Sequence, residues 1–306
     1  MRNEIQQGGI GGARFVDPVV LARVGNLELV ARAVVEGFIN GMHRSAQFGA
    51  SVDFAEHRGY TPGDDIRRVD WKLFGRTDRF YIKEYEADTN VNFACLLDIS
   101  KSMTFGSRGI SKFEYGRILA ACLTYMMHRQ RDRVGFAAFD DDIVEYVPPS
   151  AKHMETTLHI LDRLKPARSG ALAPPMKKLA ELFARRGLLV LISDFYEDPQ
   201  AVLEAVAPLR SRGHDMIVFH VLDPAEVDFG YDQASAFEDL ESGEQIPVVP
   251  EAFAEQYRAL IKEHSDALRS KFSELRIDYA LLNTATSLDQ ALFSYLSMRE
   301  QATRVR

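Results

Sequence analysis

The sequence predicts an α/β protein, a doubly wound and mostly parallel β-sheet with an N-terminal helical and irregular extension. After residue 90, short apolar runs alternate with segments of helical periodicity. Strands that alternate with helices in this way form a mostly parallel sheet with helices on both faces. The runs at 93–97 and 188–193 are apolar almost throughout, which is typical of strands buried on both sides. A chain of 306 residues is long enough for such a domain and an extension.

The composition is that of a globular protein, with 46% hydrophobic residues, 26% charged residues and a formal net charge of -7. Its apolar runs are short blocks such as 188–192, far below the roughly 18 residues that a membrane helix needs. The first twelve residues have no apolar stretch of the kind that forms a secretory signal. We therefore expect a cytoplasmic protein without a membrane span. Cys95 and Cys122 fall in a predicted strand and a predicted helix, where we expect buried thiols.

The chain before residue 91 divides into two predicted parts. Residues 1–16 are rich in glycine, and we expect a flexible N-terminus. Residues 17–90 are expected to form N-terminal helices and a charged arm. Asp17 and Pro18 have the residue types of a helix cap and a first helical position, and Gly25 with Asn26 divides the following apolar pattern into two helices. The remainder, to residue 90, is charged and rich in turn residues.

Residues 91–306 are predicted to form the α/β domain. The apolar runs predict strands at 93–97, 134–139, 143–147, 188–193, 216–222 and 277–281, of which 143–147 is the hairpin partner of the strand before it. Helical periodicity predicts helices at 112–130, 154–164, 176–186, 200–210, 252–272 and 288–298. The acidic stretch from 223 to 257 is interpreted as a solvated loop and helix entry.

Two strand ends carry the side chains of a candidate site. Ligands of such sheets gather at the carboxyl ends of the strands, where Asp98, Ser100 and Ser102 follow the first apolar run and Asp194 follows a later one. In an extended segment, alternate side chains point the same way, so the first three residues are expected to present three oxygen atoms to one point. The alternative is that Asp98 or Ser100 only caps the segment that follows.

Two carboxylates and two hydroxyls form a hard, oxygen-only ligand set, which suits Mg²⁺ or Mn²⁺. Neutral hydroxyls leave such a cation electrophilic, with coordination positions for water or for a carboxylate of another molecule. The pattern therefore favours a docking site over a reaction centre.

These residues resemble a known site and a known family. Asp98-x-Ser100-x-Ser102 with the later Asp194 is similar to the metal-ion-dependent adhesion site (MIDAS) of the von Willebrand factor A fold. The segment from Glu56 to Lys72, which continues to Glu86, resembles the hallmark of the bacterial domain-of-unknown-function family fifty-eight. This resemblance implies a von Willebrand factor A-like, Rossmann-like domain. It also implies an adaptor that works with a MoxR-type AAA+ ATPase and a client protein in chaperone-like maturation of protein complexes.

One position departs from the adhesion-site pattern. The resemblance implies a further ligand from a threonine in the loop between the two carboxylate strands, and this chain has Ala171 at that position. Ser169 or water is expected to replace the threonine, unless the cation site is weak or empty.

The charged hallmark interleaves basic and acidic residues and includes two aromatic anchors. One interpretation is a lattice of internal salt bridges that stiffens a surface arm. The other is a partner-binding patch, because aromatic residues and arginine are favoured at interfaces. The residues predicted for that patch are Arg58, Tyr60, Asp64, Asp65, Arg67, Asp70 and Trp71.

The function predicted from these observations is a non-catalytic, protein-binding adaptor. The chain has no phosphate-binding Gly-rich motif, no His-Glu-x-x-His and no Gly-x-Ser-x-Gly, and we do not expect an enzyme or a nucleic-acid-binding protein. One alternative is a metal-dependent phosphatase with Asp98 as nucleophile, although Ser100 stands where such enzymes need a second acid. Another is an interaction scaffold that binds no metal.

Overall fold

The computed structural model describes residues 17–44, 57–59, 81–83, 91–166, 168–229, 235–238, 245–248 and 250–304. The chain divides into two compact units. One comprises Met1–Ala13 and Ile39–Asn90, and the other comprises Arg14–Phe38 and Val91–Arg306. The larger unit holds the main sheet and the candidate site.

The larger unit is built on a six-stranded sheet whose order is β10-β7-β6-β3-β4-β5. All neighbouring strands are parallel except β4 and β5, which form an antiparallel hairpin. This arrangement confirms the predicted α/β class and the mostly parallel sheet. The strands are β3 (Asn92–Asp98), β4 (Arg133–Phe139), β5 (Ile143–Ser150), β6 (Leu188–Ser193), β7 (Asp215–Leu222) and β10 (Asp278–Asn283).

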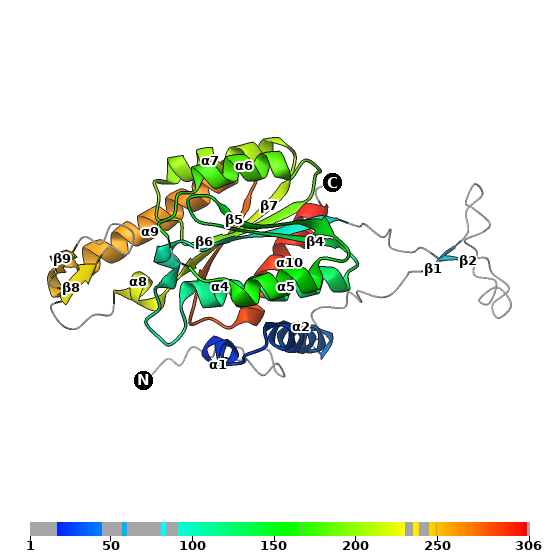
Figure 1. Ribbon diagram of the computed structural model, residues 1–306, viewed down its shortest axis with the longest axis horizontal. Coiled ribbons are helices and arrows are strands. Elements are labelled where there is room, and N and C mark those ends of the chain that lie inside the picture. The colour runs from blue at the N-terminus through cyan, green and yellow to red at the C-terminus, as the bar shows by residue number, and fades with distance from the viewer. Residues whose placement is uncertain are drawn as a thin grey trace, which may run out of the picture. The chain divides into compact units, whose positions relative to one another are not determined.

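Helices cover both faces of this sheet, as the doubly wound prediction requires (Figure 1). On one face lie α4 (Lys112–Arg129), α5 (Met154–Arg163) and α10 (Leu288–Arg304). On the other lie α6 (Ala173–Leu182), α7 (Pro199–Ser211) and α9 (Pro250–Glu274). Among the described residues, no helix is both long and apolar enough to cross a membrane.

The direction of the chain reverses beside β3. From β3 the chain runs through α4 to β4 on one side, and it later returns to β6 on the other side of β3. The helices that follow β3 and β6 lie on opposite faces of the sheet, so the chain changes direction where these two strands end (Figure 1). Asp98 is the last residue of β3, and Asp194 directly follows β6.

The core alternates between the two faces along each strand. Ala94 and Leu96 belong to a buried cluster with side chains of α6, α7 and α9. Leu97 lies on the α4 side, where a Cβ on Gly116 would be only 3.1 Å from its Cδ1 atom and 3.2 Å from Cγ2 of Ile192. The glycine therefore allows α4 to pack closely against β3 and β6 near their carboxyl ends.

The two predicted N-terminal helices are present, as α1 (Pro18–Ala22) and α2 (Leu27–Arg44). Asp17 caps α1 through a 2.9 Å bond from the N–H of Val19, and Pro18 occupies the first helical position. The structure describes two strands of the smaller unit, β1 (His57–Gly59) and β2 (Tyr81–Lys83), which are antiparallel. Residues 1–16 lie outside the described part.

The acidic stretch after β7 contains more regular structure than its composition predicted. It forms α8 (Pro224–Asp228) and a separate hairpin of β8 (Ser235–Glu238) and β9 (Gln245–Val248). α8 begins with a capping box in which the side chains of Asp223 and Glu226 each accept a backbone N–H.

Candidate cation site at the ends of two central strands

The four predicted ligands, Asp98, Ser100, Ser102 and Asp194, converge at the end of the β3–β6 pair; we call them the candidate cation site. The segment is not extended beyond Ser100, because a 3-10 helix, η2 (Lys101–Thr104), begins there. The serine side chains meet despite this turn, with their Oγ atoms 3.0 Å apart. Oδ1 of Asp98 accepts a 2.8 Å bond from the N–H of Ser100, which holds the carboxylate beside them.

Ser193 connects the two strand ends. Its hydroxyl donates a 2.6 Å bond to Oδ2 of Asp98 and accepts a 3.1 Å bond from the N–H of Phe195. Both oxygen atoms of Asp98 are therefore held by donors. Burial raises the pKa of Asp98 to about 7, the negative charge of Asp194 adds to the rise, and the hydrogen bonds from Ser193 and Ser100 oppose it.

The side chains of the site are largely buried. Asp98 is 8% exposed, Asp194 3% and Ser100 3%. Ser102 and Lys101 are partly exposed. Solvent therefore reaches Ser102 and Lys101, whereas the two carboxylates are almost completely buried.

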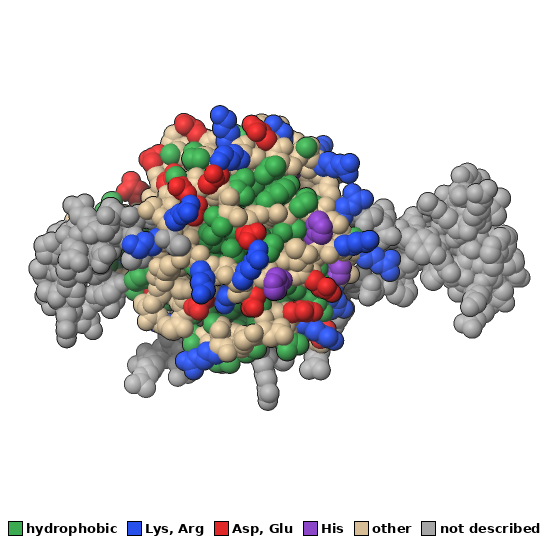
Figure 2. All heavy atoms as spheres, viewed as in Figure 1, with side chains coloured by type: hydrophobic (Ala, Val, Ile, Leu, Met, Phe, Trp, Pro, Cys, Tyr) green, Lys and Arg blue, Asp and Glu red, His purple; other side chains and the backbone are tan. Residues whose placement is uncertain are grey.

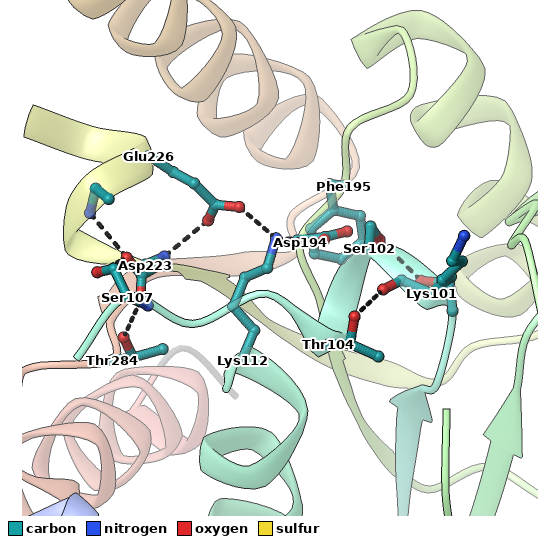
Figure 3. Close-up of polar contacts among 12 residues, drawn as sticks. Lys101, Ser102, Thr104, Ser107, Lys112, Asp194, Phe195, Asp223, Glu226 and Thr284 are labelled. Atoms are coloured by element: carbon teal, nitrogen blue, oxygen red, sulfur yellow. Dashed lines mark hydrogen bonds and ion pairs between the residues drawn. The ribbon is translucent and has the colours of Figure 1, made fainter. Parts of the chain in front are cut away.

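Lys112, which the sequence analysis did not single out, pairs with Asp194. Its Nζ atom lies 2.7 Å from Oδ2 of Asp194 and 2.7 Å from Oε1 of Glu226 (Figure 3). Burial lowers the pKa of Lys112, but the two carboxylates outweigh burial and the net shift is upward. The Nζ atom also lies 4.6 Å from the ring centroid of Tyr196. A lysine in the first turn of a helix opposes the helix dipole, and this was the one signal in the sequence that pointed to a special role.

Glu226 joins the Lys112 pair to α8. Its second oxygen, Oε2, accepts a 2.8 Å bond from the N–H of Asp223, and Asp223 in turn bonds to both the N–H and the hydroxyl of Ser107. Burial raises the pKa of Glu226, against the lowering effect of Lys112. The candidate cation site is thus continuous with a polar network that reaches α8 and the loop before α4.

The loop before α6 closes over the serine pair. The N–H of Lys101 donates a 2.7 Å bond to the carbonyl of Arg168, and Gly170 lies against Ser100. A Cβ on Gly170 would be 2.5 Å from Cβ of Ser100, so the close approach requires glycine. Ala171, at the predicted threonine position, donates its N–H to the carbonyl of Asp140 at 3.4 Å and brings no hydroxyl.

The chemistry of these residues fits a divalent cation. Across the described residues, no cluster of three His, Cys, Asp or Glu side chains could hold a metal, so the serine hydroxyls are essential to the set. Asp98, Asp194 and Glu226 are buried, and the ammonium of Lys112 pairs with the last two, so these four side chains carry a net charge of -2 when all are ionised. A divalent cation would neutralise this charge and relieve the repulsion that raises the pKa of Asp98.

The predicted partner-binding patch belongs to the smaller unit. Arg58 is in β1, where its backbone pairs with Ile82 of β2. The other patch residues lie outside the described residues: Tyr60, Asp64, Asp65, Arg67, Asp70 and Trp71. The patch therefore stays a prediction.

Comparison with known proteins identifies the family. Residues 56–267 match the family model described as protein of unknown function DUF58. The chain belongs to the DUF58 family. Among the relatives of this DUF58 protein are an uncharacterized protein of Mycobacterium bovis, Mb1516, and one of Mycobacterium tuberculosis, Rv1480. Each is 27% identical over 263 residues, which cover 83% of this chain and 82% of the relative.

Solved structures with a similar arrangement include BatB from Bacteroides thetaiotaomicron and the SpRpn10 von Willebrand factor A (VWA) domain. BatB is 18% identical with a TM-score of 0.46, over 69% of the DUF58 chain and 99% of its own. The SpRpn10 domain is 13% identical with a TM-score of 0.39, over 66% of the DUF58 chain and 92% of the SpRpn10 chain. The strand order of the DUF58 protein, with one antiparallel strand at the edge, is that of a mostly parallel α/β sheet, as the sequence predicted.

Proposed function

We propose that this DUF58 protein is a non-catalytic adaptor that binds a partner protein through a divalent cation at the ends of β3 and β6. The observation that carries the proposal is the convergence of Asp98 and Asp194, 96 positions apart in the chain, beside two serine hydroxyls. The convergence occurs at the place in the sheet where ligands of doubly wound proteins bind.

The residues of the site have different roles in the proposed binding. The bonds from Ser193 and Ser100 fix the carboxylate of Asp98, and the two serines supply neutral oxygen atoms. Bound there, Mg²⁺ or Mn²⁺ would supply a Lewis-acidic position for a carboxylate of the partner. The negative charge of Asp194 would attract the cation as well as the ammonium of Lys112. Because the carboxylates are buried, the partner approaches from the side of Ser102.

We further propose a MoxR-type AAA+ ATPase and a client protein as the partners, with a role in chaperone-like maturation in the cytoplasm. The support for this step is the resemblance carried by the segment from Glu56 to Glu86. It is independent of the cation site, and a different outcome of the experiment below tests it.

The test is capture of a purified MoxR-type ATPase with ATP and Mg²⁺, with and without a chelator. We expect capture by the wild type in Mg²⁺, with loss of capture in chelator and in Asp98→Ala. Asp162→Ala, an exposed aspartate on α5, is the matched control and should retain capture. Capture that is equal with and without chelator would contradict a cation-dependent interface, and no capture under any condition would contradict the choice of partner.

Two observations favour a second candidate, a scaffold that binds no metal. Lys112 already supplies a positive charge to Asp194, and Ala171 brings no hydroxyl to the site. A metal-free scaffold predicts the same thermal stability in Mg²⁺ and in chelator, whereas the adaptor proposed here predicts stabilisation by Mg²⁺.

A further inference from the structure

Lys112 is the basic side chain of the site network, and it is completely buried, at 0% exposure. It lies at the first position of α4, after the N-cap Ser111. A cation there is disfavoured by the helix dipole and by desolvation, so the two carboxylates at 2.7 Å must compensate for both. A buried ammonium that needs two ion pairs to offset its desolvation is a candidate for a role beyond packing.

We propose that Lys112 is a positioning residue that orients Asp194 and sets the net charge of the candidate cation site, so that the site matches a divalent cation. This inference rests on the cation site of the proposed function. It does not depend on which protein the adaptor binds.

The orientation of Asp194 follows from how its oxygen atoms are used. Oδ2 is bound by Lys112 at 2.7 Å, so a cation at the site would have Oδ1 as its ligand. The Nζ atom of Lys112 is itself held between Asp194, Glu226 and the face of Tyr196, so it cannot turn away without leaving a buried carboxylate unpaired.

The charge of the site follows from which ionised groups are buried together. The ionised side chains of Asp98, Asp194 and Glu226 contribute three negative charges and Lys112 one positive charge, a net charge of -2. Asp223 is also buried but is not counted, because N–H and hydroxyl donors bind its carboxylate and Lys112 does not. In a poorly solvated site, an uncompensated charge is costly, so the preferred cation is the one that brings the total to zero. Without Lys112 the net charge would be -3, and without the charge of Glu226 it would be -1.

Calorimetric titration of the full chain with Mn²⁺ and with Tb³⁺ at pH 7.5 tests this inference. Glu226→Gln should weaken Mn²⁺ binding at least tenfold. Lys112→Met should raise the ratio of Tb³⁺ affinity to Mn²⁺ affinity at least tenfold. The double variant Lys112→Met/Glu226→Gln restores the net charge of -2 and should return this ratio to within about threefold of the wild type.

Two further variants serve as controls. Lys112→Arg keeps the charge and should keep the wild-type ratio. Lys178→Met removes an exposed lysine that pairs with Asp142 at 2.6 Å, and it should change neither affinity. If Lys112→Met does not fold, Glu226→Gln and the double variant, which leaves fewer unpaired charges, still decide the question.

The outcomes separate this inference from the proposed function. If the wild type binds Mn²⁺ but Glu226→Gln and the double variant leave both affinities unchanged, Lys112 does not set the charge, and the adaptor proposal stands. If the double variant stays as selective for Tb³⁺ as Lys112→Met, the charge account is wrong. If the wild type binds neither cation, both the inference and the cation-dependent function are overturned.

Discussion

Asp98 and Asp194 are buried neighbours with unequal surroundings. Asp194 is paired with the ammonium of Lys112, whereas Asp98 is held by neutral donors, the N–H of Ser100 and the hydroxyl of Ser193. The repulsion between the two carboxylates therefore disfavours the ionised form of Asp98, whose pKa rises to about 7 through burial and the charge of Asp194.

Replacing Asp98 with asparagine should stabilise the metal-free protein at high pH. The pKa of Asp98 is higher in the folded state than its usual value of 3.8, so the wild type loses stability as the pH rises through about 7. Asp98→Asn removes this loss, and in chelator at pH 8 we expect a gain on the order of 1 to 3 kcal/mol in the free energy of unfolding, measured with urea. The gain should shrink at pH 5.

The same variant should no longer be stabilised by Mg²⁺, because a ligand is lost. Asp162→Asn, on the surface of α5, should behave as the wild type at both pH values. If Asp98→Asn is less stable than the wild type at pH 8 as well as at pH 5, the negative charge of Asp98 does not destabilise the folded protein.

Gly170→Ala should weaken cation binding without unfolding the protein. The new Cβ would be 2.5 Å from Cβ of Ser100, so the loop or the serine must move. We expect at least a tenfold loss of Mn²⁺ affinity in calorimetry. Gly37→Ala in α2, where a Cβ meets nothing within 4 Å, should bind as the wild type and be more stable by about 1 kcal/mol. Unchanged Mn²⁺ affinity in Gly170→Ala would show that close packing of this loop on Ser100 is not needed for cation binding.

Lys112→Met should destabilise the protein strongly when no metal is present. Removal of one partner of a buried ion pair leaves unpaired buried charge, at a typical cost of about 3 to 5 kcal/mol. Lys178→Met breaks an exposed pair with Asp142 and should cost at most about 1 kcal/mol. Urea unfolding in chelator measures both changes. Equal effects of the two variants would mean that the Lys112 pairs do not contribute as buried interactions.

His220 in β7 should make the protein less stable in acid. Burial, followed by the charges of His264 and Lys112, lowers its pKa to about 3, and its Nδ1 atom lies 2.7 Å from the hydroxyl of Tyr279. Between pH 6.5 and about 3 the unfolded chain binds a proton that the folded chain does not, so stability falls as the pH falls, by up to about 1.4 kcal/mol per pH unit.

The measurement is the free energy of unfolding at pH 7 and at pH 5 for His220→Gln and the wild type. The variant should lose less stability than the wild type over this interval. His159→Gln, on the exposed face of α5, should keep the full loss. An equal loss in His220→Gln and the wild type would show that His220 is not buried as a neutral side chain.

The sheet was predictable because its strands are continuous apolar runs. The bounds of each predicted strand lie within three residues of the observed ones, as for 93–97 and Asn92–Asp98, and those of 188–193 agree at both ends. Helix ends were less predictable. The helix expected at 176–186 begins at Ala173, because prolines are tolerated in its first turn, and it ends at Leu182.

The candidate ligands were predictable because they follow apolar strands, but their surroundings were not. Lys112 is 82 residues from Asp194 and 114 from Glu226, and no spacing in the sequence relates these positions. α8 has only five residues, although the residue types of its capping box, Asp223 and Glu226, are visible in the sequence. Long-range pairs of this kind are set by the fold as a whole.

Calorimetric titration of Mg²⁺ and Mn²⁺ into the full chain at pH 8, for the wild type and for Ser100→Ala/Ser102→Ala, tests the central claim most directly. We expect one cation per chain for the wild type and a rise in melting temperature when the cation is present. The double serine variant should lose both. Absence of binding heat together with an unchanged melting temperature in the wild type would contradict the central claim.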